Sequence, residues 1–238
     1  MNLTILGSDT IAGDTECSAY LIKIQREYLL LDCGPGTYIQ LIKSRIDLDL
    51  LKYIFITHTH VDHLNDLFAL LWRFMFGINR KTPLRIFGPR EFKKFFNFSI
   101  KLYPQIAKVK FQLNISELHN QNINLGKIKV ITREVLHTKF SNAYRTEHNN
   151  KSIVYSGDTD YCDNIINLSK NADILIIECS MPDKKKVDGH LTPSLCGKIA
   201  KLSNVKKLIL DHRYPECKSA ETISAIKKYF KGDLLIYN

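Results

Sequence analysis

The densest group of potential metal ligands in this sequence lies in residues 57–63, which read Thr-His-Thr-His-Val-Asp-His. Three imidazoles and one carboxylate, from His58, His60, Asp62 and His63, make a combination that suits zinc and its first-row neighbours. Side chains two apart in an extended backbone point the same way, so we expect His58 and His60 to share a direction while Asp62 and His63 begin a helix. The segment can therefore offer ligands to two adjacent metal ions. A His-rich surface loop, the alternative, would not explain the apolar strand before it and the amphipathic helix after it.

Further polar side chains stand where short apolar runs of the sequence end, namely Asp32, His137, Asp158, Glu178 and His212. In layered α/β proteins the carboxyl ends of strands form the rim at which ligands bind. We therefore expect these residues to be aimed, with the His58 segment, at one site. Two other histidines, His119 and His148, lie in polar or turn-forming surroundings, and we expect both at the surface.

Short β-branched runs alternate with segments of helical spacing along most of the chain. The expected strands are 3–6, 19–24, 28–31, 53–56, 84–87, 109–113, 128–135, 152–155, 174–177, 208–210 and 234–237. The expected helices are 38–43, 64–76, 91–102, 161–169, 193–202 and 220–230, the last two with Thr192 and Ser219 as N-caps. Early hairpins followed by alternating strands and helices indicate an α/β fold whose sheet layers carry helices on their outer faces. No repeat, linker or low-complexity tract marks a boundary, so a single domain, 1–238, is expected.

The composition is that of an ordinary globular protein, with 45% hydrophobic and 24% charged residues in a chain of 238. Disordered, collagen-like and disulfide-dense classes are excluded. The apolar run 67–75 is interrupted by Arg73, so no membrane span is expected. The N-terminus lacks the pattern of a signal peptide, and the six cysteines form no C-x-x-C pair, which favours a cytoplasmic protein with reduced thiols. The net charge of +10 favours anionic partners, the alternative being a solvated basic surface.

The motif His58-x-His60-x-Asp62-His63, with His137, Asp158 and His212 downstream, resembles the binuclear ligand set of the metallo-β-lactamase superfamily. That resemblance implies a four-layer αββα sandwich. Asp32, in Leu-Asp-Cys-Gly-Pro-Gly, is similar to the family's first acidic motif, which supports a metal-binding loop. Within the superfamily, Glu178-Cys179-Ser180 and the segment 189–193, Gly-His-Leu-Thr-Pro, resemble ribonuclease Z and related phosphodiesterases.

The resemblance implies two metal ions, zinc first and Mn²⁺ or Fe²⁺ as alternatives. One ion would be held by His58, His60 and His137, the other by Asp62, His63 and His212, and Asp158 would bridge them. Such a pair activates a bridging hydroxide and stabilises charge on a phosphoester. The resemblance also implies Asp62, Glu178 and His190 as catalytic residues. Glu178 would orient His190, which protonates the leaving alkoxide; the alternative for this pair is a strand-end carboxylate beside a helix-capping loop histidine.

The sequence departs from tRNA-processing ribonuclease Z, in which a long arm is expected between the third histidine motif and the bridging aspartate. Here His137 and Asp158 are 21 positions apart, which leaves no room for the arm. We therefore expect a metal-dependent phosphodiesterase that acts on a nucleotide or a nucleic-acid end. The alternatives are a tRNA 3′-processing endonuclease without the arm, a thioesterase, lactonase or carboxylic-ester hydrolase, and a non-catalytic metal-stabilised module.

Two further segments carry residue types that can contact a nucleotide. Arg145, after Tyr144, can present a guanidinium to a phosphate, or it can be an ordinary hairpin arginine. The segment 91–111 interleaves aromatic and lysine residues and can bind a base and a phosphate. An amphipathic helix that buries its rings against the core or against a second copy is the favoured interpretation, and a homodimer is expected.

Overall fold

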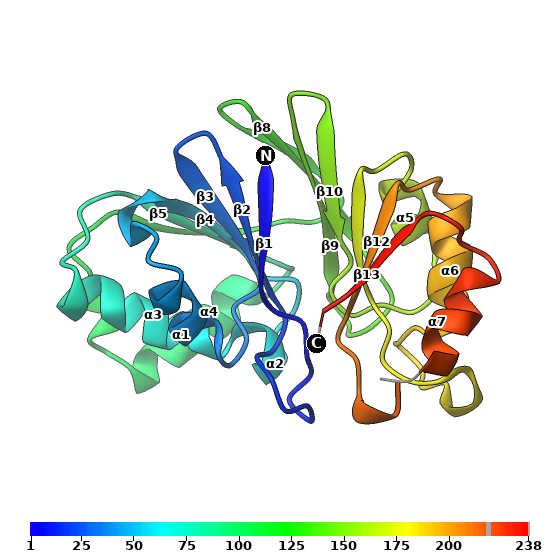
Figure 1. Cartoon of the computed structure of the whole chain (residues 1–238). Coiled ribbons are helices and arrows are strands. Elements are labelled where there is room, and N and C mark those ends of the chain that lie inside the picture. The colour runs from blue at the N-terminus through cyan, green and yellow to red at the C-terminus, as the bar shows by residue number, and fades with distance from the viewer. Residues whose placement is uncertain (218–219, 238) are drawn as a thin grey trace. The chain divides into compact units, whose positions relative to one another are not determined.

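The computed structural model describes residues 1–217 and 220–237 and divides the chain into two compact units. Unit 1 comprises Met1–Gly7 and Glu16–Leu118, and unit 2 comprises Ser8–Thr15 and His119–Asn238. Each unit contains one sheet with helices (Figure 1), which confirms the α/β class. No helix in the described part of the chain is long and apolar enough to cross a membrane. The predicted N-cap Ser219 lies outside the described residues.

The sheet of unit 1 begins with antiparallel hairpins and continues with parallel strands in the order β1 to β6. Its strands are β1 (Asn2–Gly7), β2 (Ala19–Ile24), β3 (Glu27–Leu31), β4 (Leu51–Phe55), β5 (Leu84–Gly88) and β6 (Leu113–Glu117). Because β3 and β4 are parallel neighbours, their carboxyl ends meet at the same edge. The residues after these two strands, Asp32 and the His58 segment, are therefore brought to that edge.

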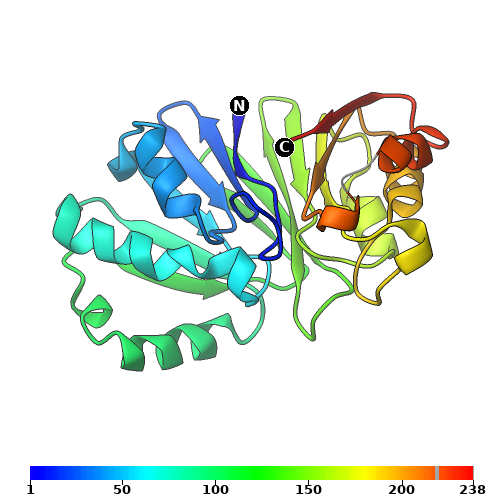
Figure 2. The ribbon, with the colours of Figure 1, turned by 60° about the horizontal axis from the view of Figure 1, so that its bottom comes forward.

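The helices of unit 1 lie on one face of its sheet (Figures 1 and 2). They are α1 (Thr37–Lys43), α2 (Val61–Leu64), α3 (Asp66–Trp72) and α4 (Phe92–Leu102), with a 3₁₀ turn at Leu48–Leu50, a π-helical turn at Arg73–Gly77 and a 3₁₀ turn at Ile106–Lys108. The hydrophobic core joins buried strand residues such as Leu30 and Ile54 to helix residues such as Leu67, Leu71 and Phe96. Leu64 belongs to the same core and anchors α2, which carries Asp62 and His63, in unit 1.

The sheet of unit 2 has the order β13-β12-β11-β10-β9-β8-β7 and combines parallel pairs with antiparallel hairpins. Its strands are β7 (Asn122–Leu125), β8 (Ile128–Glu134), β9 (Asn142–His148), β10 (Lys151–Tyr155), β11 (Ile174–Glu178), β12 (Lys207–Asp211) and β13 (Asp233–Ile236). Strands β10, β11 and β12 are parallel neighbours. Strand β8 runs the same way as β10 because both are antiparallel to β9. All four strands therefore end at one edge, where His137, Asp158, Glu178 and His212 are found.

The helices of unit 2 cover one face of its sheet (Figures 1 and 2). They are α5 (Asp163–Leu168), α6 (Pro193–Leu202) and α7 (Ala220–Lys227), with 3₁₀ turns at Asp183–Lys185 and Pro215–Cys217. Helix α6 starts as predicted, with Thr192 as N-cap and proline at its first position. The core of this unit joins Leu175, Ile177 and Leu210 of the strands to Ile199 and Ile226 of the helices.

Two predicted elements of unit 1 are wrong in position or continuity. The expected strand 109–113 is mostly loop, and β6 begins only at Leu113, because Phe111 is buried against Phe74 rather than paired in the sheet. The expected helix 64–76 is divided between α2, α3 and the π-helical turn. In that turn Ile78 N donates to the carbonyl oxygen of Arg73 at 3.1 Å, a bond across five residues that ends the regular helix.

Candidate metal centre

Asp32 is the hub of a buried hydrogen-bond network in unit 1. Its Oδ1 accepts a hydrogen bond from Thr57 N at 2.7 Å, and its Oδ2 accepts from Thr57 Oγ1 at 2.8 Å and from His63 Nδ1 at 2.7 Å. Asp32, Thr57 and His63 are all fully buried. The backbone of Asp32 has a positive φ of 56°, a conformation that is rare for a residue with a side chain and that is found at functional sites.

The same network sets the proton on two imidazoles of unit 1. Because Thr57 Oγ1 donates to Asp32, it accepts at 3.0 Å from His58 Nδ1–H. His63 likewise donates its Nδ1–H to the Asp32 carboxylate. In a neutral imidazole that donates from Nδ1, the lone pair is on Nε2. His58 and His63 are thus in the tautomer that binds a metal through Nε2.

The predicted ligands of the 57–63 segment lie together. The ring centres of His58 and His60 are 4.6 Å apart, and those of His58 and His63 are 4.2 Å apart. Asp62 and His63 lie in α2, whose N-cap is His60, as the sequence predicts. The loop that follows Asp32 is tied to this helix, since Cys33 N donates to the carbonyl oxygen of His63 at 2.7 Å.

In unit 2, the carboxylate of Asp158 stands between two imidazoles. Its Oδ2 is 3.5 Å from His137 Nε2 and 3.4 Å from His212 Nε2. All three side chains are at least nine-tenths buried. His212, like Asp32, has a positive φ, of 50°, and its backbone N donates to the carbonyl oxygen of Ser8 at 3.0 Å. The strand ends of this unit thus converge on Asp158.

The other nitrogen of each of these imidazoles is held by the protein. His137 Nδ1 donates to the carbonyl oxygen of Gly189 at 2.9 Å. His212 Nδ1 lies 3.1 Å from Ser180 Oγ, and Ser180 Oγ donates to Glu178 Oε2 at 2.7 Å. Ser180 therefore accepts the His212 proton, and in the neutral form of both imidazoles the lone pair is on Nε2, the atom that faces the Asp158 carboxylate.

Glu178 and His190 are in direct contact, with Glu178 Oε1 3.1 Å from His190 Nδ1. Glu178 is fully buried and also accepts hydrogen bonds from Thr159 N at 2.6 Å and Leu191 N at 3.0 Å. Burial lowers the pKa of His190, but the hydrogen bond and the charge of Glu178 outweigh it, so the pKa of His190 is raised. The His190 ring is stacked on that of His212 at 5.6 Å.

The sequence did not predict the supporting roles of Thr57, Ser180 and Gly189, and one predicted environment was wrong. His148 is buried rather than at the surface, with its Nδ1 3.0 Å from the carbonyl oxygen of Lys127, because the β9–β10 hairpin carries it beside the β7–β8 turn. His119 is exposed as expected and lies 2.8 Å from Glu134. Gly189 belongs to the 189–193 motif, but no sequence pattern shows that its carbonyl oxygen accepts from His137.

The two segments whose residue types can contact a nucleotide are largely structural. The Arg145 guanidinium pairs with Glu147 at 2.7 Å and donates to the carbonyl oxygens of Leu168 and Lys170, as an ordinary hairpin arginine does. In α4, Phe92 and Phe96 are buried, whereas the Phe98 side chain is 63% exposed. The segment 91–111 therefore buries part of its aromatic set in the core of unit 1.

Comparison with known proteins gives matches over nearly the whole chain. A family model described as the beta-lactamase superfamily domain matches residues 27–213. The ribonuclease Z of Prochlorococcus marinus (strain AS9601) is 28% identical over 299 aligned positions, which cover 99% of this chain and 93% of the relative. The aligned length exceeds the 238 residues of this chain, so the relative carries insertions.

Solved structures give the same fold. The metallo-β-lactamase fold protein YhfI from Bacillus subtilis has a TM-score of 0.86 at 24% identity and covers 99% of this chain and 95% of that chain. The short form of human tRNase Z has a TM-score of 0.77 at 25% identity and covers 90% of this chain and 93% of that chain. The fold that the sequence predicts is confirmed.

Proposed function

Because the chain belongs to the beta-lactamase superfamily, we propose that it is a binuclear metal-dependent hydrolase. Its proposed substrates are phosphodiesters of a nucleotide or of a nucleic-acid end. The similarity to a ribonuclease Z and to human tRNase Z supports the phosphodiesterase class. The family model spans parts of both units, which supports one hydrolase domain, 1–238.

The observation that carries the proposal is the position of Asp158. Its carboxylate faces two Nε2 atoms at 3.4 and 3.5 Å, and both imidazoles are held in the tautomer that places a lone pair there. With both imidazoles neutral, the Nε2 lone pairs and the carboxylate repel one another at this distance, whereas a divalent cation among them is attracted to all three. The donor set therefore fits a metal of the zinc type.

The resemblance implies how the ligands divide between two ions, and the hydrogen bonds show which groups orient them. One metal would be held by His58, His60 and His137 and the other by Asp62, His63 and His212, and Asp158 would serve both. Zinc is the proposed metal, with Mn²⁺ or Fe²⁺ as alternatives. Asp32 is assigned to no metal, because its oxygens are occupied by Thr57 and His63; it orients His58 and His63 instead.

The chain's own groups then divide the work of hydrolysis. Two such ions, when bound, supply an activated hydroxide and stabilise negative charge on the phosphoryl oxygens. Asp32 and Ser180 hold the ligand imidazoles in one tautomer. Glu178 orients His190 through Nδ1, which leaves Nε2 to carry the proton to the departing alkoxide. Because the pKa of His190 is raised, a larger fraction of this side chain is protonated near neutral pH than for an ordinary histidine.

Metal analysis and phosphodiester turnover test this proposal together. We expect two metal ions per chain after reconstitution, measured by elemental analysis, and hydrolysis of bis-p-nitrophenyl phosphate that is lost with a chelator. His58→Ala should lower both metal content and turnover. A protein that binds one metal or none, and in which His58→Ala changes nothing, would contradict the assignment.

Substrate choice separates the proposed function from its alternatives. The insertions of the ribonuclease Z relative and the short gap between His137 and Asp158 predict little or no cleavage of a tRNA precursor. Efficient release of a tRNA 3′ trailer would favour a tRNA endonuclease without the arm. Thioester turnover above phosphodiester turnover would favour the thioesterase class. Metal binding without turnover of any substrate would favour a non-catalytic module.

A homodimer and a cytoplasmic location remain predictions. Sedimentation of the metal-loaded protein would measure the first. All six cysteines are free thiols in the structure, an arrangement that a reducing compartment maintains; fractionation of expressing cells would measure the second.

A further inference from the structure

Unit 1 contains a cavity of about 250 Å³ that is formed by segments other than the 57–63 metal-ligand loop. Its walls come from the π-helical turn at Arg73–Gly77, the loop that follows it, and the chain around the 3₁₀ turn at Ile106–Lys108. Phe74, Phe76 and Phe111 supply aromatic surface to the lining. Phe74 and Phe111 meet edge to face at 6.2 Å and an interplanar angle of 87°.

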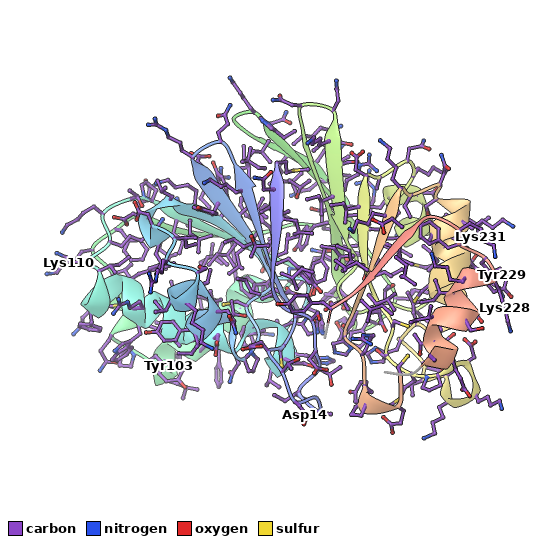
Figure 3. All side chains as sticks on the ribbon, viewed as in Figure 1. Asp14, Tyr103, Lys110, Lys228, Tyr229 and Lys231 are labelled. Atoms are coloured by element: carbon purple, nitrogen blue, oxygen red, sulfur yellow. The ribbon has the colours of Figure 1, made fainter. Side chains whose placement is uncertain are left out.

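The charge that lines this cavity is entirely positive. Arg80, Lys108 and Lys110 are lining residues, and no acidic side chain is among the described residues that line it. The two lysines are exposed, and Figure 3 shows Lys110 extending from the edge of unit 1. An anion in the cavity would therefore meet cationic groups without a competing carboxylate on the wall.

Arg80 places a buried cation at the cavity, and the dipoles of main-chain carbonyl groups balance its charge. Only 1% of its surface is exposed. Its guanidinium donates to the main-chain carbonyl oxygens of Leu48, Leu51, Thr82 and Pro83 at 2.6 to 3.0 Å. It also lies over the rings of Phe74 and Phe111, at 4.7 and 5.7 Å from their centres. Burial lowers the pKa of Arg80 to about 10, against the opposing charges of Asp49 and Asp47, so the group is charged at neutral pH.

The exposed Lys108 and Lys110 supply the charge that an anionic ligand would meet, and Arg80, held by its carbonyl partners behind the aromatic rings, adds to the positive field of the cavity. The aromatic walls favour a ring in that ligand, because ring pairs at edge-to-face or offset geometry are stabilising. Ligand sites for drug-sized molecules usually enclose about 300 to 1,000 Å³, so this cavity suits a smaller molecule of two fused rings. We propose that it is a binding site for a small aromatic carboxylate, separate from the proposed hydrolytic site.

The chain offers a direct reporter for this proposal. Among its three methionines only Met75 lines the cavity, while Met181 belongs to unit 2. In the metal-loaded protein labelled at methionine methyl groups with ¹³C, 2-naphthoate should shift the Met75 signal in a saturable way by its ring current. The Met181 signal should stay unchanged and serve as the internal reference. Met75→Leu assigns the Met75 signal.

Two ligand controls test the chemistry of the site. The neutral 2-naphthamide should bind about tenfold more weakly than 2-naphthoate, because it lacks the charge that Arg80 and the lysines attract. Octanoate, an anion without a ring, should also bind more weakly. Equal binding of the amide would overturn the anionic assignment, and tighter binding of octanoate would overturn the aromatic one.

Variants at exposed lining positions complete the test without disturbing the core. The double variant Lys108→Glu, Lys110→Glu should weaken 2-naphthoate binding by about tenfold, while Lys94→Glu on α4, outside the lining, should leave it unchanged. Gln105→Trp should fill the cavity and abolish the Met75 shift. An unchanged Met181 signal and circular dichroism spectrum establish that each variant is folded. Failure of 2-naphthoate to move Met75 in the parent protein, or full binding by the charge-reversed variant, would overturn the proposal.

Discussion

Each unit uses the same arrangement of a carboxylate, a hydroxyl and a histidine. In unit 1 the chain of hydrogen bonds runs from His58 through Thr57 to Asp32. In unit 2 it runs from His212 through Ser180 to Glu178. In both, the carboxylate forces the hydroxyl to accept from imidazole Nδ1, and a second histidine, His63 or His190, donates to the same carboxylate. In each unit the tautomer of a histidine that we propose as a metal ligand is thereby fixed by the protein itself.

This arrangement predicts that Asp32 contributes to metal affinity without binding a metal. Asp32→Asn keeps the size of the side chain but places an amide where His63 and Thr57 need an acceptor. We expect about a 10- to 100-fold loss of zinc affinity, measured by competition with a fluorescent chelator, with the circular dichroism spectrum retained. Unchanged affinity would contradict the orienting role of Asp32.

The Glu178 and His190 pair predicts an effect that depends on the leaving group. His190→Ala should preserve metal content and lower kcat by about 10²- to 10⁴-fold on a nucleotide ester, whose alkoxide needs a proton. The loss should be far smaller with bis-p-nitrophenyl phosphate, because p-nitrophenolate is stable without one. Equal losses on both substrates would indicate positioning or metal support, and unchanged rates would return the pair to a structural role.

At the scale of elements, Gly34 allows the loop after β3 to approach α2. A Cβ at Gly34 would lie 1.9 Å from the carbonyl oxygen of Asp62, which is backbone and cannot rotate away. Gly34→Ala should therefore displace the start of α2 and cost about 3 kcal/mol in the free energy of unfolding, measured by urea denaturation. Because Asp62 and His63 move with that helix, metal affinity should fall in the same variant.

Gly126 provides the matched control for this substitution. It has a φ of 60° in the β7–β8 turn, and a Cβ there would meet nothing within 4 Å. Gly126→Ala should cost about 1 kcal/mol from the left-handed backbone alone and leave metal affinity unchanged. If both alanine variants bind metal as the parent does, the contact between Gly34 and Asp62 does not position the ligands.

Most elements could be predicted because their apolar runs are short, β-branched and bounded by polar residues. Strand β2 and helix α6 have the predicted bounds. The predicted bounds are wrong where an apolar side chain is buried without belonging to a strand or helix. Phe111 is buried because it packs on Phe74 and not because it belongs to a strand. The edge strand β6 contains the polar residues Asn114 and Ser116. An edge strand tolerates such residues, but a search for apolar runs misses them.

The candidate site was predictable in its residue types and less so in its supports. His and Asp at strand ends are chemically distinctive, so His137, Asp158 and His212 could be found without coordinates. Thr57 and Ser180 are ordinary residues until the fold places a carboxylate beside each. The positive φ of Asp32 and of His212 could not be inferred, because neither is a glycine and the strain is visible only in the backbone.

For the molecule as a whole, the net charge of +10 bears on how an anionic substrate is found. A net positive field raises the encounter rate and local concentration of anions, and salt screens it. The Debye length falls from about 30 Å at 0.01 M salt to about 3 Å at 1 M. Long-range attraction is therefore present at low salt and nearly absent at high salt.

Salt should consequently raise the KM of the metal-loaded enzyme for a nucleotide p-nitrophenyl ester, a phosphodiester monoanion. Between 0.01 and 1 M salt we expect kcat/KM to fall by about tenfold, with kcat nearly constant because short contacts at the metals are little screened. Steady-state kinetics in sodium chloride and in sodium acetate at matched ionic strength separate screening from inhibition by one anion. A KM that does not change with ionic strength in either salt would mean that the charges of the 34 lysine and arginine residues do not act on the substrate and belong to a solvated surface.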